Sequence, residues 1–232
     1  MKVGTAAVRV AGGGALVASV LLAGCGSVAR TASGPSTDPN PPASLVTALC
    51  KGPGLQLSTQ DDYVYLSGSL CANDGEKFVQ YMSTTGQPYS VVRLNLTGGA
   101  GVEAVRIGHY LRDHAITTWV DADSDVCTSA CNRVFAGGSQ RIYSFADDIT
   151  TGKNPHQRTG LGFHHPNVDG DFQAAESFYQ DLIAPYLKEM LPPAAYDWVY
   201  QADESNLTYN MIWLNGGQAL QLGIATDSNP PR

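Results

Sequence analysis

The chain has 232 residues, of which 43% are hydrophobic and 15% are charged, and it contains 25 glycines and 13 prolines. This composition excludes a coiled coil, a collagen-like fibre and a wholly disordered chain. Its 21 acidic residues outnumber its 14 basic ones, which gives a formal net charge of −7. Because a negative surface repels phosphate backbones, we expect no nucleic-acid partner.

The first 24 residues predict an export signal. Residues 1–9 carry two positive charges, at Lys2 and Arg9. The apolar stretch that follows, at 10–23, is shorter than the roughly 20 residues of a membrane-spanning helix. The stretch ends in Leu22–Cys25 (LAGC), which resembles the lipobox of bacterial lipoproteins. This resemblance implies cleavage before Cys25, lipidation of Cys25 and an exported chain anchored to the cell envelope on the extracytoplasmic face of the membrane. An ordinary secretory signal with an unrelated cysteine is the alternative.

Residues 25–44 predict a linker between the lipidated cysteine and a folded domain. The segment is rich in Ser, Pro, Gly and Thr and has almost no large apolar side chain, so it cannot bury enough surface to fold. We expect it to hold the domain at 45–232 away from the membrane. That domain is long enough to bury one hydrophobic core.

Four cysteines remain in the expected mature chain after Cys25, namely Cys50, Cys71, Cys127 and Cys131. An even number of cysteines in an exported protein predicts disulfides. Of the three pairings that four cysteines allow, the sequence favours Cys50–Cys71 with Cys127–Cys131, because these are near neighbours. A zinc site is the alternative, although neither pair has the two-residue spacing of a zinc knuckle.

Strand and helix patterns alternate along the domain. Alternating or β-branched side chains predict strands at 63–70, 89–96, 115–120, 141–145 and 160–164. Apolar residues at helical spacing predict helices at 74–84, 102–114, 128–135, 172–191 and 218–222, whereas the pattern at 199–214 is mixed. This alternation predicts βαβ units and a mainly parallel sheet in one α/β domain.

Two short motifs consist of small residues at places where backbone N–H groups are free to bind an anionic oxygen. Gly98 and Gly99 follow a predicted strand, where glycines let N–H groups turn toward an anionic oxygen. Such a turn serves as an oxyanion hole, a phosphate cradle or only a tight turn. Ser129 begins a predicted helix, whose N-terminus carries partial positive charge. A serine in this place is also a common helix N-cap.

The third motif places a histidine at the end of a predicted strand, at Gly162–Pro166 (GFHHP). A serine nucleophile needs a base, and histidine is suited to that role because its pKa lies near neutrality. Neighbouring residues of an extended segment point to opposite faces, so His165 cannot share the role of His164, and we favour His164. A histidine at a strand end is otherwise often structural.

Taken in order, Thr97-Gly98-Gly99, Ser129-Ala130 and His164-His165-Pro166 resemble the Clp-protease/crotonase superfamily, and in particular its exported ClpP-like branch. The resemblance runs from about residue 63 to 226. It implies a spiral of βαβ units around a mainly parallel sheet.

The resemblance also implies site residues. Ser129 would be the nucleophile and His164 the general base, with an oxyanion hole made by the N–H groups of Gly98, Gly99 and Ala130. It implies a peptide or protein substrate, and it is consistent with a homo-oligomer. No cofactor and no metal are expected.

One member of the expected catalytic triad has no counterpart. The family has an acidic residue shortly before the closing helix, and the matching stretch at 209–214 contains no carboxylate. Asn210 is the candidate that would orient His164, as an asparagine does in Cys-His-Asn proteases. Asp203 and Glu204 are also near in sequence. The orienting residue matters, because a misoriented base lowers turnover by about 10⁴-fold.

These observations predict a lipid-anchored serine hydrolase, and among serine hydrolases they favour a peptidase. The alternative is a catalytically inactive ClpP-like lipoprotein that acts as a binding or scaffold module, since a fold does not fix a function. Acyl-thioester chemistry of the crotonase kind is disfavoured because export separates the chain from coenzyme A.

Overall fold

The structure, a computed structural model, describes residues 53–60, 62–85 and 88–231. These residues belong to one unit, Pro39–Arg232. The expected signal and linker, with Cys25 and Cys50, lie outside the described residues. In the part of the chain that is described, no helix is both long enough and apolar enough to span a membrane.

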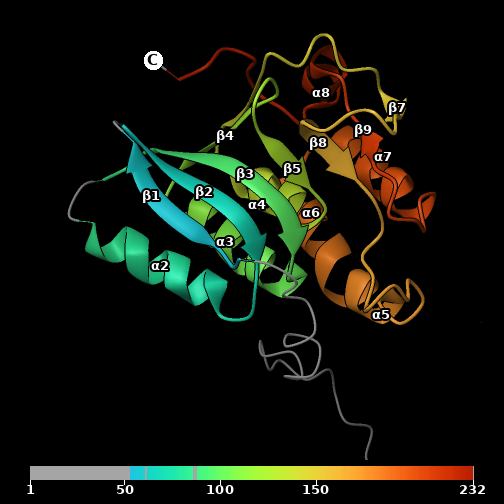
Figure 1. Cartoon of the computed structure of the whole chain (residues 1–232), viewed down its shortest axis with the longest axis horizontal. Helices are drawn as coiled ribbons and strands as arrows, with labels where there is room; N and C mark the ends of the chain where they lie inside the picture. The colour runs from blue at the N-terminus through green and yellow to red at the C-terminus, as the bar shows by residue number, and fades with distance from the viewer. Residues whose placement is uncertain (1–52, 61, 86–87, 232) are drawn as a thin grey trace, which may run out of the picture. The chain divides into compact units, whose positions relative to one another are not determined.

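The described strands form a single nine-stranded sheet (Figure 1). They are β1 (Gln56–Gln60), β2 (Tyr63–Leu70), β3 (Val91–Gly99), β4 (Thr117–Asp121), β5 (Val126–Thr128), β6 (Arg141–Ser144), β7 (Gly152–Lys153), β8 (Gly160–Phe163) and β9 (Ile212–Trp213). β2, β3, β5 and β8 are parallel neighbours, and β3 also pairs in parallel with β4, which pairs with β6. Among the described strands, antiparallel pairs occur between β1 and β2 at one end of the sheet and between β8, β9 and β7 at the other, so the predicted mainly parallel sheet is confirmed.

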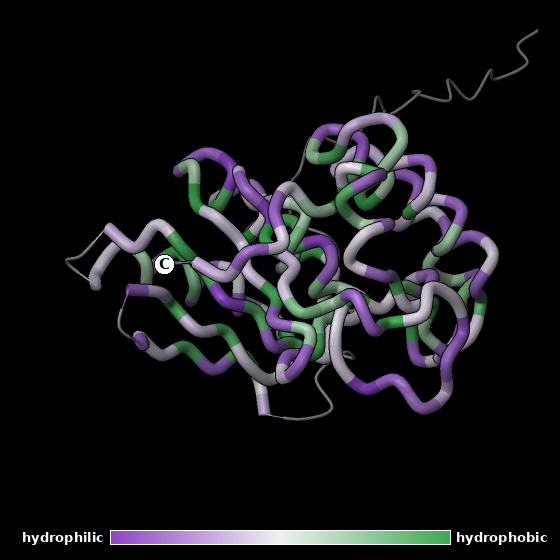
Figure 2. Tube along the Cα trace, turned by 90° about the horizontal axis from the view of Figure 1, so that it is seen from above, coloured by the Kyte–Doolittle hydropathy of each residue, from purple (hydrophilic) through white to green (hydrophobic). Residues whose placement is uncertain are grey.

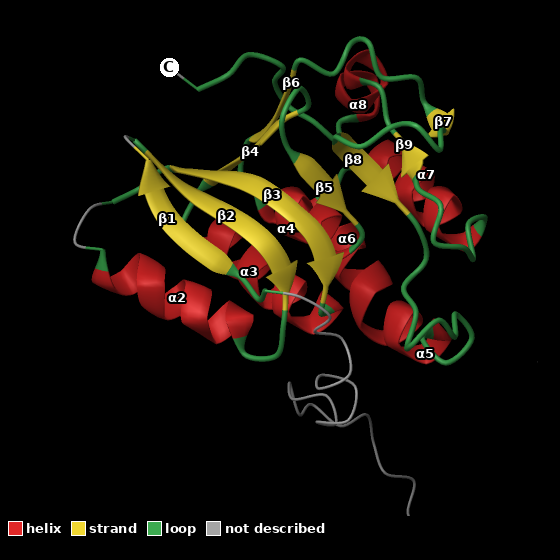
Figure 3. Ribbon diagram, in the orientation of Figure 1, coloured by secondary structure: helices red, strands yellow, loops and turns green. Residues whose placement is uncertain are grey.

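The described helices are α2 (Asp74–Thr84), α3 (Gly101–Asp113), α4 (Ala130–Gly137), α5 (Glu176–Phe178), the π-helical turn η1 (Tyr179–Ile183), α6 (Ala184–Met190), α7 (Pro193–Glu204) and α8 (Gly216–Leu222). α2, α3 and α4 connect parallel strands, as βαβ units require. The segment from α5 to α7 lies between β8 and the antiparallel β9, and α8 follows β9. Helix α3 packs between α2 and α4, and α6 packs against α4 (Figure 3). The α/β architecture expected from the sequence is therefore present.

The core lies between the sheet and these helices. Along β3, Val92, Leu94 and Leu96 are fully buried and alternate with partly exposed residues, which is the pattern of a strand with one covered face. Phe78 of α2 and Ile107 of α3 are buried in the same cluster. Figure 2 shows the hydrophilic residues gathered along outer loops and turns, with hydrophobic stretches further inside.

Several boundaries differ from the sequence prediction. Thr128, expected in a helix, ends β5 because it pairs with Gly162 of β8. The helix expected at 172–191 begins at Glu176 and contains the π-helical turn. The mixed stretch at 199–214 contains the end of α7 and the short strand β9. β1 was not predicted, because its residues are mostly exposed and carry no apolar alternation.

Candidate active site

Three neighbouring parallel strands bring the three sequence motifs to one edge of the sheet. β3 pairs with β5 through Leu96 and Cys127, and β5 pairs with β8 through Thr128 and Gly162. Gly98 and Gly99 end β3, whereas Ser129 and His164 follow directly on β5 and β8. Because the carboxyl ends of parallel strands share an edge, residues distant in sequence converge there, which is the usual location of ligand sites in such sheets.

Ser129 occupies a strained turn between β5 and α4. Its backbone has φ 56° and ψ −120°, a conformation that costs roughly 1–3 kcal/mol in a residue with a side chain. Its N–H donates to the Gly162 carbonyl at 3.1 Å, and its carbonyl accepts from Arg133 Nη1 at 2.9 Å. Although Ser129 is the N-cap of α4, its side chain makes no capping hydrogen bond. The turn therefore resembles the strained strand-to-helix turns that present a nucleophilic serine.

A disulfide between Cys127 and Cys131 brackets this turn, as the sequence predicts. It links the middle of β5 to the second residue of α4, and both cysteines are fully buried. Cys71 is also disulfide-bonded. Its expected partner, Cys50, lies outside the part of the chain that the structure describes.

The glycine turn packs directly against the serine. Gly98 and Gly99 have φ of 109° and 117°, a region that disfavours any residue with a Cβ. A Cβ on Gly98 would lie 2.9 Å from Ser129 Cβ, and one on Gly99 would lie 2.2 Å from the Leu70 carbonyl oxygen. Ala130 is the first residue of α4, where backbone N–H groups have no intrahelical acceptor. These positions suit the amides of an oxyanion hole.

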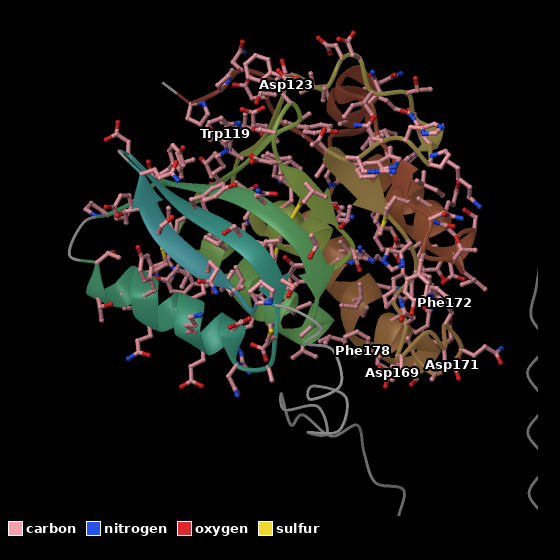
Figure 4. All side chains as sticks on the ribbon, in the orientation of Figure 1. Trp119, Asp123, Asp169, Asp171, Phe172 and Phe178 are labelled. Carbon is pink, nitrogen blue, oxygen red and sulfur yellow. A yellow bond between two sulfur atoms is a disulfide. The ribbon has the colours of Figure 1, made fainter. Side chains whose placement is uncertain are left out.

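A cavity of about 250 Å³ opens at this edge. Gly99, Ser129, Ala130 and His164 all line it, whereas Gly98 does not. The remaining wall is largely apolar and includes Val102, Ala175, Phe178, Ile183, Tyr209 and Met211. Figure 4 shows Phe178 in α5, beside the loop that carries Asp169, Asp171 and Phe172. The structure thus brings the expected nucleophile and the expected base to one apolar pocket.

His164 lies in this cavity as a neutral imidazole. Its side chain is only 5% exposed, and burial lowers its pKa from 6.5 to about 4, with a further contribution from the positive charge of Arg133. Its Nδ1 is buried and has no hydrogen-bond partner among the described residues. A neutral imidazole is able to accept a proton, but none of the described side chains orients this one through Nδ1.

The residues expected to orient His164 lie elsewhere. Asn210 is exposed, and its backbone carbonyl accepts a hydrogen bond from Asn206. Asp203 is fully buried and forms an ion pair with Arg133. Glu204 Oε1 lies 3.5 Å from His165 Nε2. None of these three side chains forms a hydrogen bond with the buried Nδ1 of His164.

Arg133 is the residue of this region that the sequence interpretation missed. It lies one helical turn after Ser129, lines the cavity and is fully buried, with its charge balanced by Asp203. Burial raises the pKa of Asp203 from 3.8 to about 6, and Tyr179 Oη lies 3.3 Å from its Oδ2. The available signal was a lone arginine within an apolar helix, because a buried charge is rarely left unpaired.

Comparison with solved structures agrees with this topology. A mutant of ClpP1 from Listeria monocytogenes superposes with a TM-score of 0.52 at 15% identity, over 74% of this chain and 92% of that chain. The ClpP protease catalytic domain from Plasmodium falciparum gives a TM-score of 0.51 at 14% identity, over 74% and 87% of the two chains. The chain has a ClpP-like fold.

No protein-family model matches the sequence, and no similar curated protein was found. At 14% to 15% identity, the likeness to the ClpP structures concerns the fold alone.

Proposed function

We propose that this protein is a lipid-anchored, extracytoplasmic serine hydrolase that cleaves peptides, with Ser129 as the nucleophile and His164 as the base. The observation that carries the proposal is the strained Ser129 turn. Its side chain makes no capping bond, it packs on Gly98, and it lines the same cavity as His164. Strain of this kind is typical of functional residues.

The proposed reaction follows from these positions. Ser129 Oγ attacks the carbonyl carbon of the scissile bond, and the His164 imidazole takes the hydroxyl proton. The backbone amides of Gly99 and Ala130 stabilise the oxyanion. His164 then gives its proton to the leaving amine, and water hydrolyses the acyl-enzyme with the same base. The apolar wall formed by residues such as Val102 and Ile183 favours an apolar side chain next to the scissile bond.

The first test is covalent labelling of the full chain, purified in detergent, with a fluorophosphonate probe. We expect the wild type to be labelled, and the label to be lost in Ser129→Ala and reduced at least 100-fold in His164→Ala. Ser228→Ala, at an exposed serine outside the cavity, is the matched control and should be labelled like the wild type. Labelling that persists in Ser129→Ala contradicts the assignment.

A non-catalytic binding module is the second candidate function, and a specific observation favours it. The buried Nδ1 of His164 has no partner in the described residues, so the imidazole lacks the carboxylate or amide that holds a catalytic base in place. In that case the apolar cavity would bind a peptide without cleaving it. A folded wild type that takes no label but binds peptides in the cavity supports this candidate over hydrolysis.

A further inference from the structure

A second group of polar side chains lies on the other side of the His164-His165 pair. His165 Nε2 is 3.3 Å from Glu176 Oε2 and 3.5 Å from Glu204 Oε1. One ligand atom from each residue lies within 4.8 Å of the other two. The three residues come from separate segments, because they follow β8, begin α5 and end α7. This cluster, which we call the His165 site, has no role in the proposed hydrolysis.

The hydrogen bonding of His165 leaves one of its ring nitrogens facing the two carboxylates. His165 Nδ1 is 2.8 Å from the Pro166 carbonyl oxygen, which only accepts hydrogen bonds, so Nδ1 carries the ring proton. Nε2 belongs to a side chain that is 0% exposed, and it has no hydrogen-bond partner in the structure as described. Nε2 is therefore the ring nitrogen left to act as a ligand, and a carboxylate oxygen of each glutamate lies within 3.5 Å of it.

We propose that His165, Glu176 and Glu204 bind a divalent transition-metal ion of the zinc type. Ligands at about 2.0–2.2 Å from a tetrahedral zinc are roughly 3.4 Å from one another. The observed 3.3 Å and 3.5 Å separations match that spacing. The imidazole nitrogen selects zinc-like ions over Ca²⁺ and Mg²⁺, which prefer oxygen ligands alone.

The surroundings of the His165 site fit a metal centre. Metal-binding histidines commonly donate their other ring N–H to a carbonyl, as Nδ1 does here to Pro166. Two carboxylates would balance the charge of a divalent ion. The Glu176 and Glu204 side chains are 49% and 37% exposed, which gives an ion access from solvent and leaves room for water as a further ligand.

A bound ion would connect the segment after β8 to α5 and α7. Glu176 begins the helical segment that lines the cavity through Phe178, and His165 is adjacent to the proposed base. The ion would thereby position the cavity wall without touching a substrate. The metal site does not depend on Ser129 being a nucleophile, so a measurement of metal binding tests it independently of the proposed hydrolysis.

The test is direct metal binding to the full chain in detergent, after affinity tags are removed and metals are stripped with EDTA. We expect calorimetry to show one Zn²⁺ per chain, and Co²⁺ to give the visible absorption of a four-coordinate site. Glu176→Gln and Glu204→Gln keep the side-chain shape but lose the charge, and each should weaken the affinity at least tenfold.

Glu189→Gln is the matched control. Glu189 lies 3.9 Å from His109 in an exposed His–Glu pair to which the described residues add no third ligand, so this change should leave the affinity unaltered. Absence of stoichiometric binding in a folded wild type would overturn the proposal, as would wild-type affinity in both glutamine variants. A doubly protonated His165 by NMR, with no metal uptake, would show an ordinary ion pair and would also overturn it.

Discussion

Backbone conformation at two residues controls the geometry of the candidate nucleophile. Ser129 has a positive φ despite its side chain, and Gly98 has the positive φ that glycine adopts without strain. The two residues are in direct contact, since a Cβ on Gly98 would meet that of Ser129. Strain at the serine is therefore accommodated only because the neighbouring turn has no side chains.

Gly98→Ala should damage both stability and labelling. The added Cβ would lie 2.9 Å from Ser129 Cβ and 3.1 Å from the Thr128 carbonyl oxygen, at a φ of 109°. We expect the free energy of unfolding to fall by about 2–4 kcal/mol, measured by urea denaturation, with fluorophosphonate labelling at most one tenth of the wild-type rate.

Gly152→Ala is the control for the effect of φ alone. Gly152 has φ 127°, but a Cβ there meets nothing within 4 Å. Gly152→Ala should lower the free energy of unfolding by only about 1–2 kcal/mol and leave the labelling rate unchanged. Equal losses in the two variants would show that the contact with Ser129 is unimportant.

The buried environment of His164 predicts the pH dependence of labelling. His164 must be neutral to accept the Ser129 proton, and burial lowers its pKa to about 4. The labelling rate should therefore be retained as pH falls through 6 and decline only near pH 4, measured on EDTA-stripped protein. A decline centred near 6.5, the ordinary histidine pKa, would show that the imidazole is solvated during the reaction.

At the scale of elements, the short helix α4 connects the candidate site to the core. It begins directly after Ser129, is anchored to β5 by the disulfide, and carries Arg133, which pairs with Asp203 of α7. Its other end packs closely on α3, where a Cβ on Gly137 would lie 2.3 Å from Gly108 Cα. The position of Ser129 therefore depends on packing at both ends of α4.

Removal of the Cys127–Cys131 disulfide should loosen the Ser129 turn. The bridge closes a very short loop, for which chain entropy gives about 2 kcal/mol of stabilisation. In Cys127→Ala/Cys131→Ala, we expect a lower melting temperature and slower labelling. The melting temperature of this variant should respond less to reductant than that of the wild type. Unchanged labelling in the variant would show that the sheet holds the turn without the bridge.

Gly137→Ala tests the contact between α3 and α4. The backbones of two helices meet at this position, so an added methyl group must separate them. We expect the free energy of unfolding to fall by about 1–3 kcal/mol. Gly217→Ala, in α8, meets only the Asn215 side chain at 3.2 Å and is the matched control. Comparable melting temperatures for the two variants would contradict close packing of these helices.

At the scale of the whole molecule, the proposal places a folded ClpP-like domain on a lipid anchor. In a bacterial host, the wild type should incorporate radiolabelled palmitate and fractionate with membranes, because stable attachment requires more than one acyl chain. Cys25→Ala should take up no palmitate, whereas Ser27→Ala should behave like the wild type. Palmitate uptake by Cys25→Ala would contradict lipidation at this cysteine.

Local sequence patterns determined the main features of this protein. Apolar alternation predicted β2 and β3, helical spacing predicted α2 and α3, and the order of the motifs at Gly98, Ser129 and His164 indicated one candidate site. These features depend on neighbouring residues and on the rule that parallel strands align their carboxyl ends. The disulfide between Cys127 and Cys131 was predictable for the same reason, since the two cysteines are close in sequence.

Only the tertiary structure decided what surrounds His164. The packing of α7 against the rest of the domain directs Asp203 to Arg133 and Glu204 to His165, and it leaves His164 Nδ1 without a partner in the described residues. The His165 site likewise joins three segments that are remote in sequence. Contacts of this kind depend on how whole helices pack, and no local spacing of residues encodes them.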